Sequence, residues 1–179
     1  MKSAKTRKTR RSYLQDFKKD KDGKYVYQGS WHRYQYGQLS RQKLLIRLWM
    51  MCAVLLCAAV TAGCIPAAGM DECFYVLLPY TISLVAGISV CWSLGRLSAA
   101  GERVRSYVYE TSCSKIPFRS AVAAVFAGAA LLGELLFLFL HHFEGADGWA
   151  VLFLALELAA CASAFLIYRM ASRIRWTLC

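Results

Sequence analysis

The stretch AVAAVFAGAALLGELLFLFL-HHFEGADG-WAVLFLALELAACASAFLIY, residues 121–168, decides the fold of this chain. It consists of two apolar runs, 121–140 and 149–168, joined by a short polar link. About 20 apolar residues in a helix cross a hydrocarbon layer of roughly 30 Å. Each run has that length, so the stretch predicts a transmembrane helical hairpin.

Two further apolar runs precede this hairpin, at 45–65 and 74–94. Hydrophobic residues make up 58% of the chain, which is more than an ordinary soluble domain contains. We therefore predict an all-α fold: an integral membrane four-helix transmembrane bundle over residues 44–179, preceded by a disordered basic N-terminal arm, 1–43. Four such runs also predict a multi-pass protein of the cell membrane.

The positive charges are distributed unevenly along the chain, which carries 22 Lys and Arg residues and a net charge of +11. The links 66–73 and 141–148 contain none of these cations, whereas the link 95–120 and the two terminal segments hold all of them except Arg47. Lys and Arg accumulate in cytoplasmic loops. The pattern predicts that both termini are cytoplasmic.

The basic arm suggests either nucleic acid or anionic lipid headgroups as a partner. Because it precedes four apolar runs, lipid headgroups are the simpler interpretation, and we expect no nucleic-acid partner. Within the arm, aromatic rings alternate with cations, and the segment resembles a short hairpin around Gln28-Gly29-Ser30. Its side chains either rest among headgroups or dock a partner. These candidate contacts are Tyr25, Tyr27, Trp31, Arg33, Tyr34 and Tyr36.

Two acids lie inside the apolar runs of the hairpin, Glu134 and Glu157. They are six and eight residues from the linked ends of the runs, at depths of about 9 Å and about 12 Å, so antiparallel neighbours would place them at nearly one level. Charged carboxyls in hydrocarbon are costly, and at least one should be protonated unless a cation is bound. The run 74–94 offers polar groups at similar depth, so the sequence predicts a candidate proton or cation site formed by Glu134, Glu157, Tyr80, Thr81 and Ser83.

The other reactive residues give weaker patterns. Cys64 and Cys73 fall together on the predicted outer side, where a disulfide between them is one alternative. His141 and His142 are adjacent but lack a third well-placed ligand, so no metal site is predicted. The chain contains no Gly-rich phosphate loop, HExxH or GxSxG motif, and we expect neither a cofactor nor enzymatic activity.

Two functions remain open from the sequence. The first is a non-enzymatic accessory or scaffold subunit of a membrane complex, with a membrane protein or a second copy of the chain as its partner. Small residues recurring every four positions in the apolar runs favour such close helix packing. The alternative is a small proton- or cation-coupled transporter or channel that uses Glu134 and Glu157.

Overall fold

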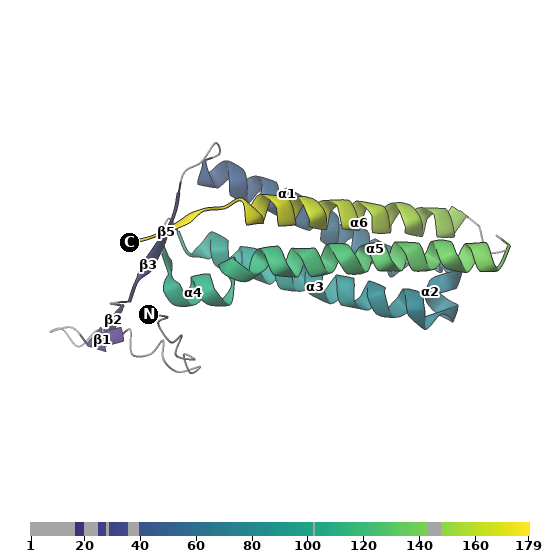
Figure 1. Ribbon diagram of the computed structural model, residues 1–179, viewed down its shortest axis with the longest axis horizontal. Helices are drawn as coiled ribbons and strands as arrows, with labels where there is room; N and C mark the ends of the chain where they lie inside the picture. Colours follow the sequence, from purple (N-terminus) through teal and green to yellow (C-terminus); the bar gives the residue numbers. More distant parts are fainter. Residues whose placement is uncertain (1–16, 20–24, 28, 36–39, 102, 143–147) are drawn as a thin grey trace, which may run out of the picture.

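The computed structural model describes residues 17–19, 25–27, 29–35, 40–101, 103–142 and 148–179, and it is mostly helical. Four long helices lie side by side: α1 (Arg41–Ala62), α3 (Phe74–Ala99), α5 (Ile116–Leu140) and α6 (Gly148–Ser172). All four are long and apolar enough to cross a membrane. The elongated bundle carries a small β-sheet at one end and the short helix α2 (Ala68–Glu72) at the other (Figure 1). We call these the sheet end and the α2 end.

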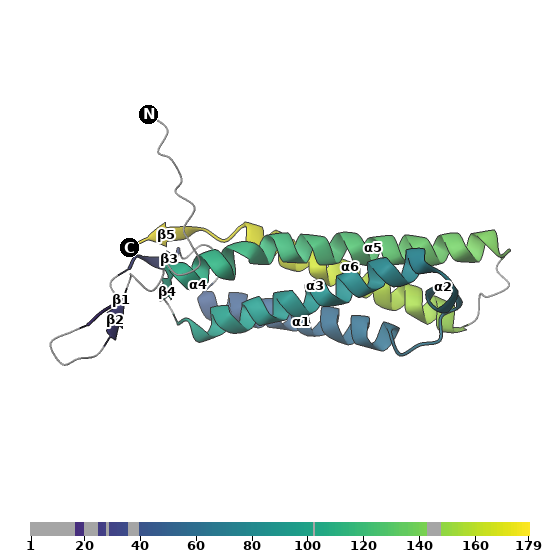
Figure 2. The same ribbon diagram turned by 90° about the horizontal axis from the view of Figure 1, so that it is seen from below.

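The helices form a closed ring in which α1 packs on α3, α3 on α5, α5 on α6 and α6 on α1. Figure 2 shows the same bundle from below, with α3 and α5 crossing in front of α6. The two helices of the predicted hairpin are therefore neighbours, as the short link between them requires. Each helix packs mainly on two others, so each buries two stripes of its surface.

The helices extend past the predicted apolar runs mainly at the sheet end. There α3 continues to Ala99, α5 begins at Ile116 and α6 continues to Ser172. Pro117 stands in the first turn of α5, where its missing N–H costs no hydrogen bond. Hydropathy marks where hydrocarbon would end, but a helix continues for as long as its backbone hydrogen bonds are favourable.

Large apolar side chains and small residues fill the interior of the bundle. Leu48, Leu55, Val90, Phe153 and Ile167 are almost completely buried. Ala123, Ala127, Ala160 and Ala164 are also inaccessible and allow α5 and α6 to approach closely. The outward faces are equally apolar, with exposed side chains that include Val54, Val60, Val85, Ile88, Val125, Leu132, Val151 and Leu158.

The sheet end is built from three distant parts of the chain. Strand β3 (Trp31–Tyr34) lies between β4 (Arg103–Arg105) and β5 (Trp176–Leu178), and both pairings are antiparallel. One sheet face packs onto the bundle through Tyr34 and Val104, which are buried. The short helices α4 (Ser106–Thr111) and η2 (Cys113–Lys115) then lead from the sheet into α5.

These strands were not predicted by the all-α assignment. The hairpin around Gln28-Gly29-Ser30 is wrong, because β2 (Tyr25–Tyr27) pairs with β1 (Phe17–Lys19) while β3 pairs with β4 and β5. The alternation of rings in one segment suggested a local pairing, but each strand finds its partner elsewhere. Of the arm predicted to be disordered, 1–43, the structure describes residues 17–19, 25–27, 29–35 and 40–43, which include β1, β2, β3 and the start of α1, and the prediction for the remainder lies outside the described residues.

Candidate functional site

Glu157 lies in the middle of α6 and faces the interior of the bundle, with 1% of its surface exposed. Neither of its carboxyl oxygens accepts a hydrogen bond from any residue that the structure describes. Its titratable neighbours are Tyr80 of α3 and Cys161, one turn further along α6. An ionised carboxylate in such a place is very costly, so a bound proton is the simplest way to stabilise it.

Glu134 of α5 is also fully buried, with no exposed surface. It lies beneath α2, where a side chain added at Gly69 would collide with the Glu134 carboxyl group. Gly69 thus lets the α2 backbone pass close over this acid. The short helix α2 covers Glu134 at the α2 end of the bundle, a role that the sequence did not reveal.

The two acids occupy successive levels of the bundle. The Cys161 thiol donates to the Ala124 carbonyl oxygen over 3.4 Å, and a Cβ added at Gly128 would be 3.7 Å from the Cys161 sulfur. Glu157 is one turn nearer the α2 end than Cys161, which places Glu134 roughly one further turn away, or about 5 Å along the axis. Depth counted from the ends of the apolar runs predicted nearly one level, because it ignores the stagger between α5 and α6.

The polar residues of α3 divide between the inside and the outside of the bundle. Tyr80 is buried, and its hydroxyl donates to the Ala59 carbonyl oxygen over 2.8 Å. Ser83 is buried as well and donates to the Ala123 carbonyl oxygen over 3.2 Å. Thr81 is exposed and donates to the Leu78 carbonyl oxygen of its own helix, so it is not part of the buried layer.

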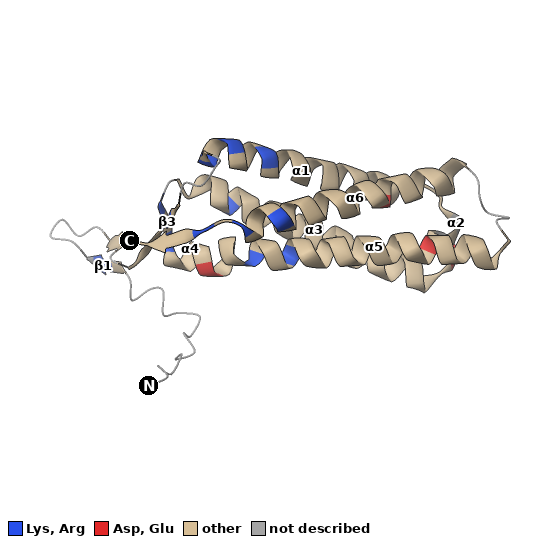
Figure 3. Ribbon diagram, turned by 45° about the horizontal axis from the view of Figure 1, so that its top comes forward, with Lys and Arg blue, Asp and Glu red and all other residues tan. Residues whose placement is uncertain are grey.

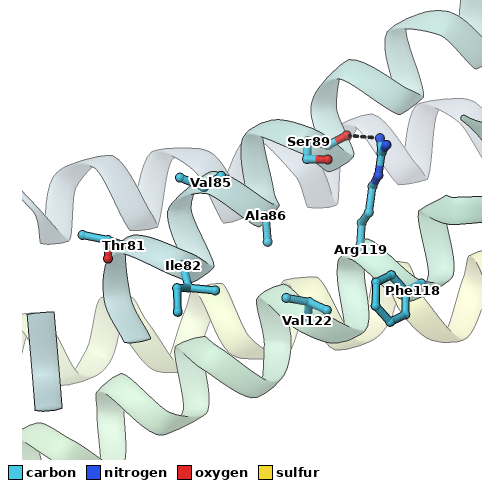
Figure 4. Close-up of a pocket in the computed structure, with 8 residues that line it drawn as sticks. All are labelled: Thr81, Ile82, Val85, Ala86, Ser89, Phe118, Arg119 and Val122. Atoms are coloured by element: carbon cyan, nitrogen blue, oxygen red, sulfur yellow. Dashed lines mark hydrogen bonds between the residues drawn. The ribbon is translucent and has the colours of Figure 1, made fainter. Parts of the chain in front are cut away.

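A groove of about 410 Å³ lies between α3 and α5, with Thr81 near one end and Arg119 near the other (Figure 4). Arg119 donates to the Ser89 carbonyl oxygen over 3.1 Å and to the Ser93 hydroxyl. Most of the remaining lining is apolar, with Ile82, Val85 and Val122. Because the Arg119 guanidinium group is already bonded to α3, the groove suits an apolar ligand better than an anion.

The aromatic residues of the N-terminal segment are mostly engaged within the protein. The Arg105 guanidinium carbon lies 5.8 Å from the ring centre of Phe17, 5.5 Å from that of Tyr27 and 5.9 Å from that of Trp31. Such distances are typical of cation–π contacts. Only part of the predicted docking set therefore remains free for a partner.

The other predicted docking residues differ in their accessibility. Tyr34 is buried against Trp176, with their ring centres 6.1 Å apart, while Tyr25 and Arg33 are exposed. Tyr36 lies outside the described residues. Arg33, the one cation of this set, is therefore accessible to a partner on the sheet.

The sequence did not reveal the residues that contact these aromatic rings. Tyr109 of α4 stacks on His32, with ring centres 4.1 Å apart, and also contacts Trp176 at 5.5 Å. Arg105 and Tyr109 belong to the link 95–120, which the sequence analysis used only for its positive charge. Aromatic residues in three distant segments, 25–36, 107–109 and 176–178, were the available signal, but their presence does not specify which segments pair.

The cysteines and histidines form no recognisable reactive centre. Cys64 and Cys73 are both free thiols. His141 bonds the Phe137 carbonyl oxygen over 3.0 Å and stacks on the Phe137 ring. Among the described residues, no cluster of His, Cys, Asp and Glu side chains is suited to a metal ion.

Comparison of the chain with protein-family models, with curated proteins and with solved structures gives no match.

Proposed function

We propose that this chain is a multi-pass protein of the cell membrane that acts as a non-enzymatic accessory or scaffold subunit. The observation that carries the proposal is the distribution of polarity in the bundle, in which polar side chains lie inside and apolar side chains cover the surface. Glu134, Glu157, Ser83 and Ser163 are buried, whereas the outward faces of all four helices expose aliphatic side chains. Apolar surface on every side suits lipid, where polar groups must be satisfied inside the protein.

The proposed orientation places both termini and the sheet end in the cytoplasm. Lys and Arg positions gather at the sheet end, while the acidic positions of α5 and α6 lie nearer the α2 end (Figure 3). The sequence between Cys64 and Gly95 and between Ser120 and Tyr168 contains no Lys or Arg. Each basic residue near an anionic cytoplasmic leaflet contributes about 1 kcal/mol of attraction.

The outer face of the three-stranded sheet is the proposed contact surface for a partner. Arg33 and Thr177 are opposite each other in neighbouring strands and are both exposed. Cations that are held on a sheet give a partner a more fixed surface than an unstructured arm would. The proposed partners are a membrane protein or a second copy of this chain, together with anionic headgroups.

In-cell crosslinking followed by purification in mild detergent tests this role. We expect wild-type protein and the control Arg173→Glu to retain the same crosslinked partner, and Arg33→Glu to lose most of it at an equal membrane level. Arg173 is an exposed cation at the same end but outside the sheet. Equal recovery with all three proteins would exclude the sheet face as the contact surface.

Glu157 favours a second candidate function, a proton- or cation-coupled transporter or channel. Its two carboxyl oxygens are buried and accept no hydrogen bond from the described residues, although a purely structural acid would be expected to bond across helices. Tyr80 from α3 lies beside it, so a proton or cation bound there would contact two helices.

Flux measurements in reconstituted vesicles distinguish this candidate from the first. In a transporter, Glu157→Gln should abolish pH-dependent proton or cation flux, whereas Glu110→Gln should leave it unchanged, because Glu110 is exposed in α4. Absence of flux from the wild-type protein, or equal flux from wild-type protein and Glu157→Gln, would exclude the transport role.

A further inference from the structure

A second pocket, of about 400 Å³, lies at the sheet end and is lined by residues of β3, β4 and α4 and of the C-terminal part of α3. We call it the arginine pocket, because three arginines are among the residues that line it. Its lining residues are Trp31, Arg96, Arg103, Arg105, Val108 and the pair Ala99 and Ala100.

Two of these arginines are held in place by aromatic rings. Arg105 lies over Phe17, Tyr27 and Trp31, as described above. Arg96 lies over the Tyr107 ring at 5.6 Å and donates a long hydrogen bond, 3.4 Å, to the Thr111 hydroxyl. A ring contacts the flat face of a guanidinium group and leaves the N–H donors at its edge available. Groups positioned in advance lose less conformational entropy when they bind a ligand.

The pocket concentrates positive charge from three arginines. Within the described part of the chain, no Asp or Glu forms an ion pair with Arg96, Arg103 or Arg105. Arg33 of β3 is directly opposite Arg103 of β4, so a fourth arginine lies on the same side of the sheet as Arg103. Like charges opposite each other weaken a strand pair. An anion bound between them would remove this repulsion.

We propose that the arginine pocket binds a phosphomonoester. Guanidinium forks match phosphate oxygens in geometry, and several of them together favour a dianion over a single carboxylate. The volume is within the range of small-molecule sites, about 300–1,000 Å³, and it exceeds what the phosphate needs alone. Val108 and the two alanines provide an apolar wall for the group that the phosphate carries.

Two sources share this chemistry: a phospholipid with a phosphomonoester headgroup and a soluble phosphorylated metabolite. A pocket at the cationic end of the bundle would be level with the headgroups in the proposed orientation. The phosphate site itself does not depend on the scaffold role, since it follows from the arginines and the cavity alone.

The test uses the purified full chain and two probes with the same phosphate group, phosphatidic acid in phosphatidylcholine nanodiscs and soluble glycerol 3-phosphate. Retained lipid is measured by native mass spectrometry, and binding of the soluble probe by calorimetry. Binding of phosphatidic acid alone identifies the lipid source, and binding of glycerol 3-phosphate identifies the soluble source. Binding of neither probe overturns the proposal.

The double variant Arg96→Gln/Arg103→Gln should weaken binding of the active probe about tenfold or more, the equivalent of at least one charge-assisted hydrogen bond. The control Arg173→Gln/Arg175→Gln removes the same charge from exposed positions outside the pocket and should change binding less than about twofold. An equal loss in both variants would show that net charge, and not the pocket, attracts phosphate, and would overturn the proposal.

The single variant Arg103→Lys covers the case in which the double variant does not fold. It keeps the charge and loses the forked donor geometry, so it should weaken binding while the thermal unfolding temperature stays that of wild type. Unchanged binding would contradict recognition by the guanidinium fork. Because these variants leave Arg33 intact, the result is independent of the crosslinking test of the scaffold role.

Discussion

The Tyr80 hydroxyl of α3 donates a 2.8 Å hydrogen bond to the carbonyl oxygen of Ala59 in the last turn of α1. This bond joins two helices next to Glu157, at the point where α1 ends. A side chain added at Gly63 would collide with the Tyr80 hydroxyl, so glycine is the residue that fits there. The end of α1 is therefore shaped around this tyrosine.

Removing this hydroxyl should weaken the contact between α1 and α3. We expect Tyr80→Phe to lower the free energy of unfolding by about 1 kcal/mol, which is typical of a hydrogen bond between membrane helices. The control Tyr168→Phe removes an exposed hydroxyl and should have little effect. Thermal unfolding in detergent measures both variants. Equal stabilities would show that the bond contributes nothing net.

The close approach of α3 and α5 depends on Gly133. A Cβ at this position would lie 3.1 Å from the Tyr75 carbonyl oxygen and 3.3 Å from a Val76 methyl group. Pro79 lacks the N–H that would normally bond the Tyr75 carbonyl group, so this oxygen is left facing α5. Backbone atoms cannot move aside as a flexible side chain can.

Gly133→Ala should therefore lower the free energy of unfolding by about 1–3 kcal/mol through overpacking. Gly95→Ala is the matched control, because Gly95 is also within a helix and has nothing within 4 Å of an added Cβ. It should be neutral or stabilise the protein by about 0.5–1 kcal/mol, from the higher helix propensity of alanine. If both variants have the same stability as wild type, the helices are less closely packed than described.

The four long helices could be predicted from the sequence because each apolar run is long and uninterrupted by charge. The sheet could not be predicted, since each of its strands has only three or four residues and its partner is far away in the chain. Trp31 pairs with Arg105, and Arg33 with Thr177. No local periodicity encodes such a pairing, and the segment around Gln28-Gly29-Ser30 alone suggested a different hairpin.

The candidate acid site was only partly accessible to sequence reasoning. The inward direction of Glu134 and Glu157 followed from the cost of placing a carboxyl group in lipid. Their separation into two levels and the cover that α2 provides over Glu134 depend on how the helices are staggered, which composition does not determine. Thr81 shows the same limit, because one residue along a helix turns a side chain from the interior to the surface.

The proposed threading predicts opposite labelling of two exposed cysteines. Cys64 lies at the α2 end and Cys179 at the sheet end, and both are exposed. Single-cysteine variants that retain only one of them should react differently with a membrane-impermeant maleimide in intact cells. We expect Cys64 to be labelled from outside, and Cys179 only after the membrane is permeabilised.

A variant that retains only the buried Cys52 is the control and should stay unlabelled in both conditions. Labelling of Cys179 in intact cells would reverse the proposed orientation. Labelling of both exposed cysteines in intact cells would contradict a bundle that spans the membrane.

The stability of the protein should increase when Glu157 is replaced by an apolar side chain of similar length. Neither of its carboxyl oxygens accepts a hydrogen bond from the described residues, and a buried polar group without a partner costs about 1–3 kcal/mol. Glu157→Met should therefore raise the free energy of unfolding by about that amount. Glu157→Gln keeps a polar group in place and should gain much less. Thermal unfolding in detergent compares them with Glu110→Met, an exposed control expected to lie within about 0.5 kcal/mol of wild type.

A loss of stability in Glu157→Met would mean that the carboxyl group is bonded in the native protein, and its role would then be structural. A gain would mean that the native chain retains an acid at a cost to its own stability. Proteins keep such residues where function requires them, which is why stabilising changes at functional sites reduce activity. If Glu157→Met stabilises the protein and abolishes pH-dependent flux, the transport role is favoured. If Glu157→Met stabilises the protein, partner recovery is unchanged and the wild-type protein shows no flux, the scaffold role is favoured.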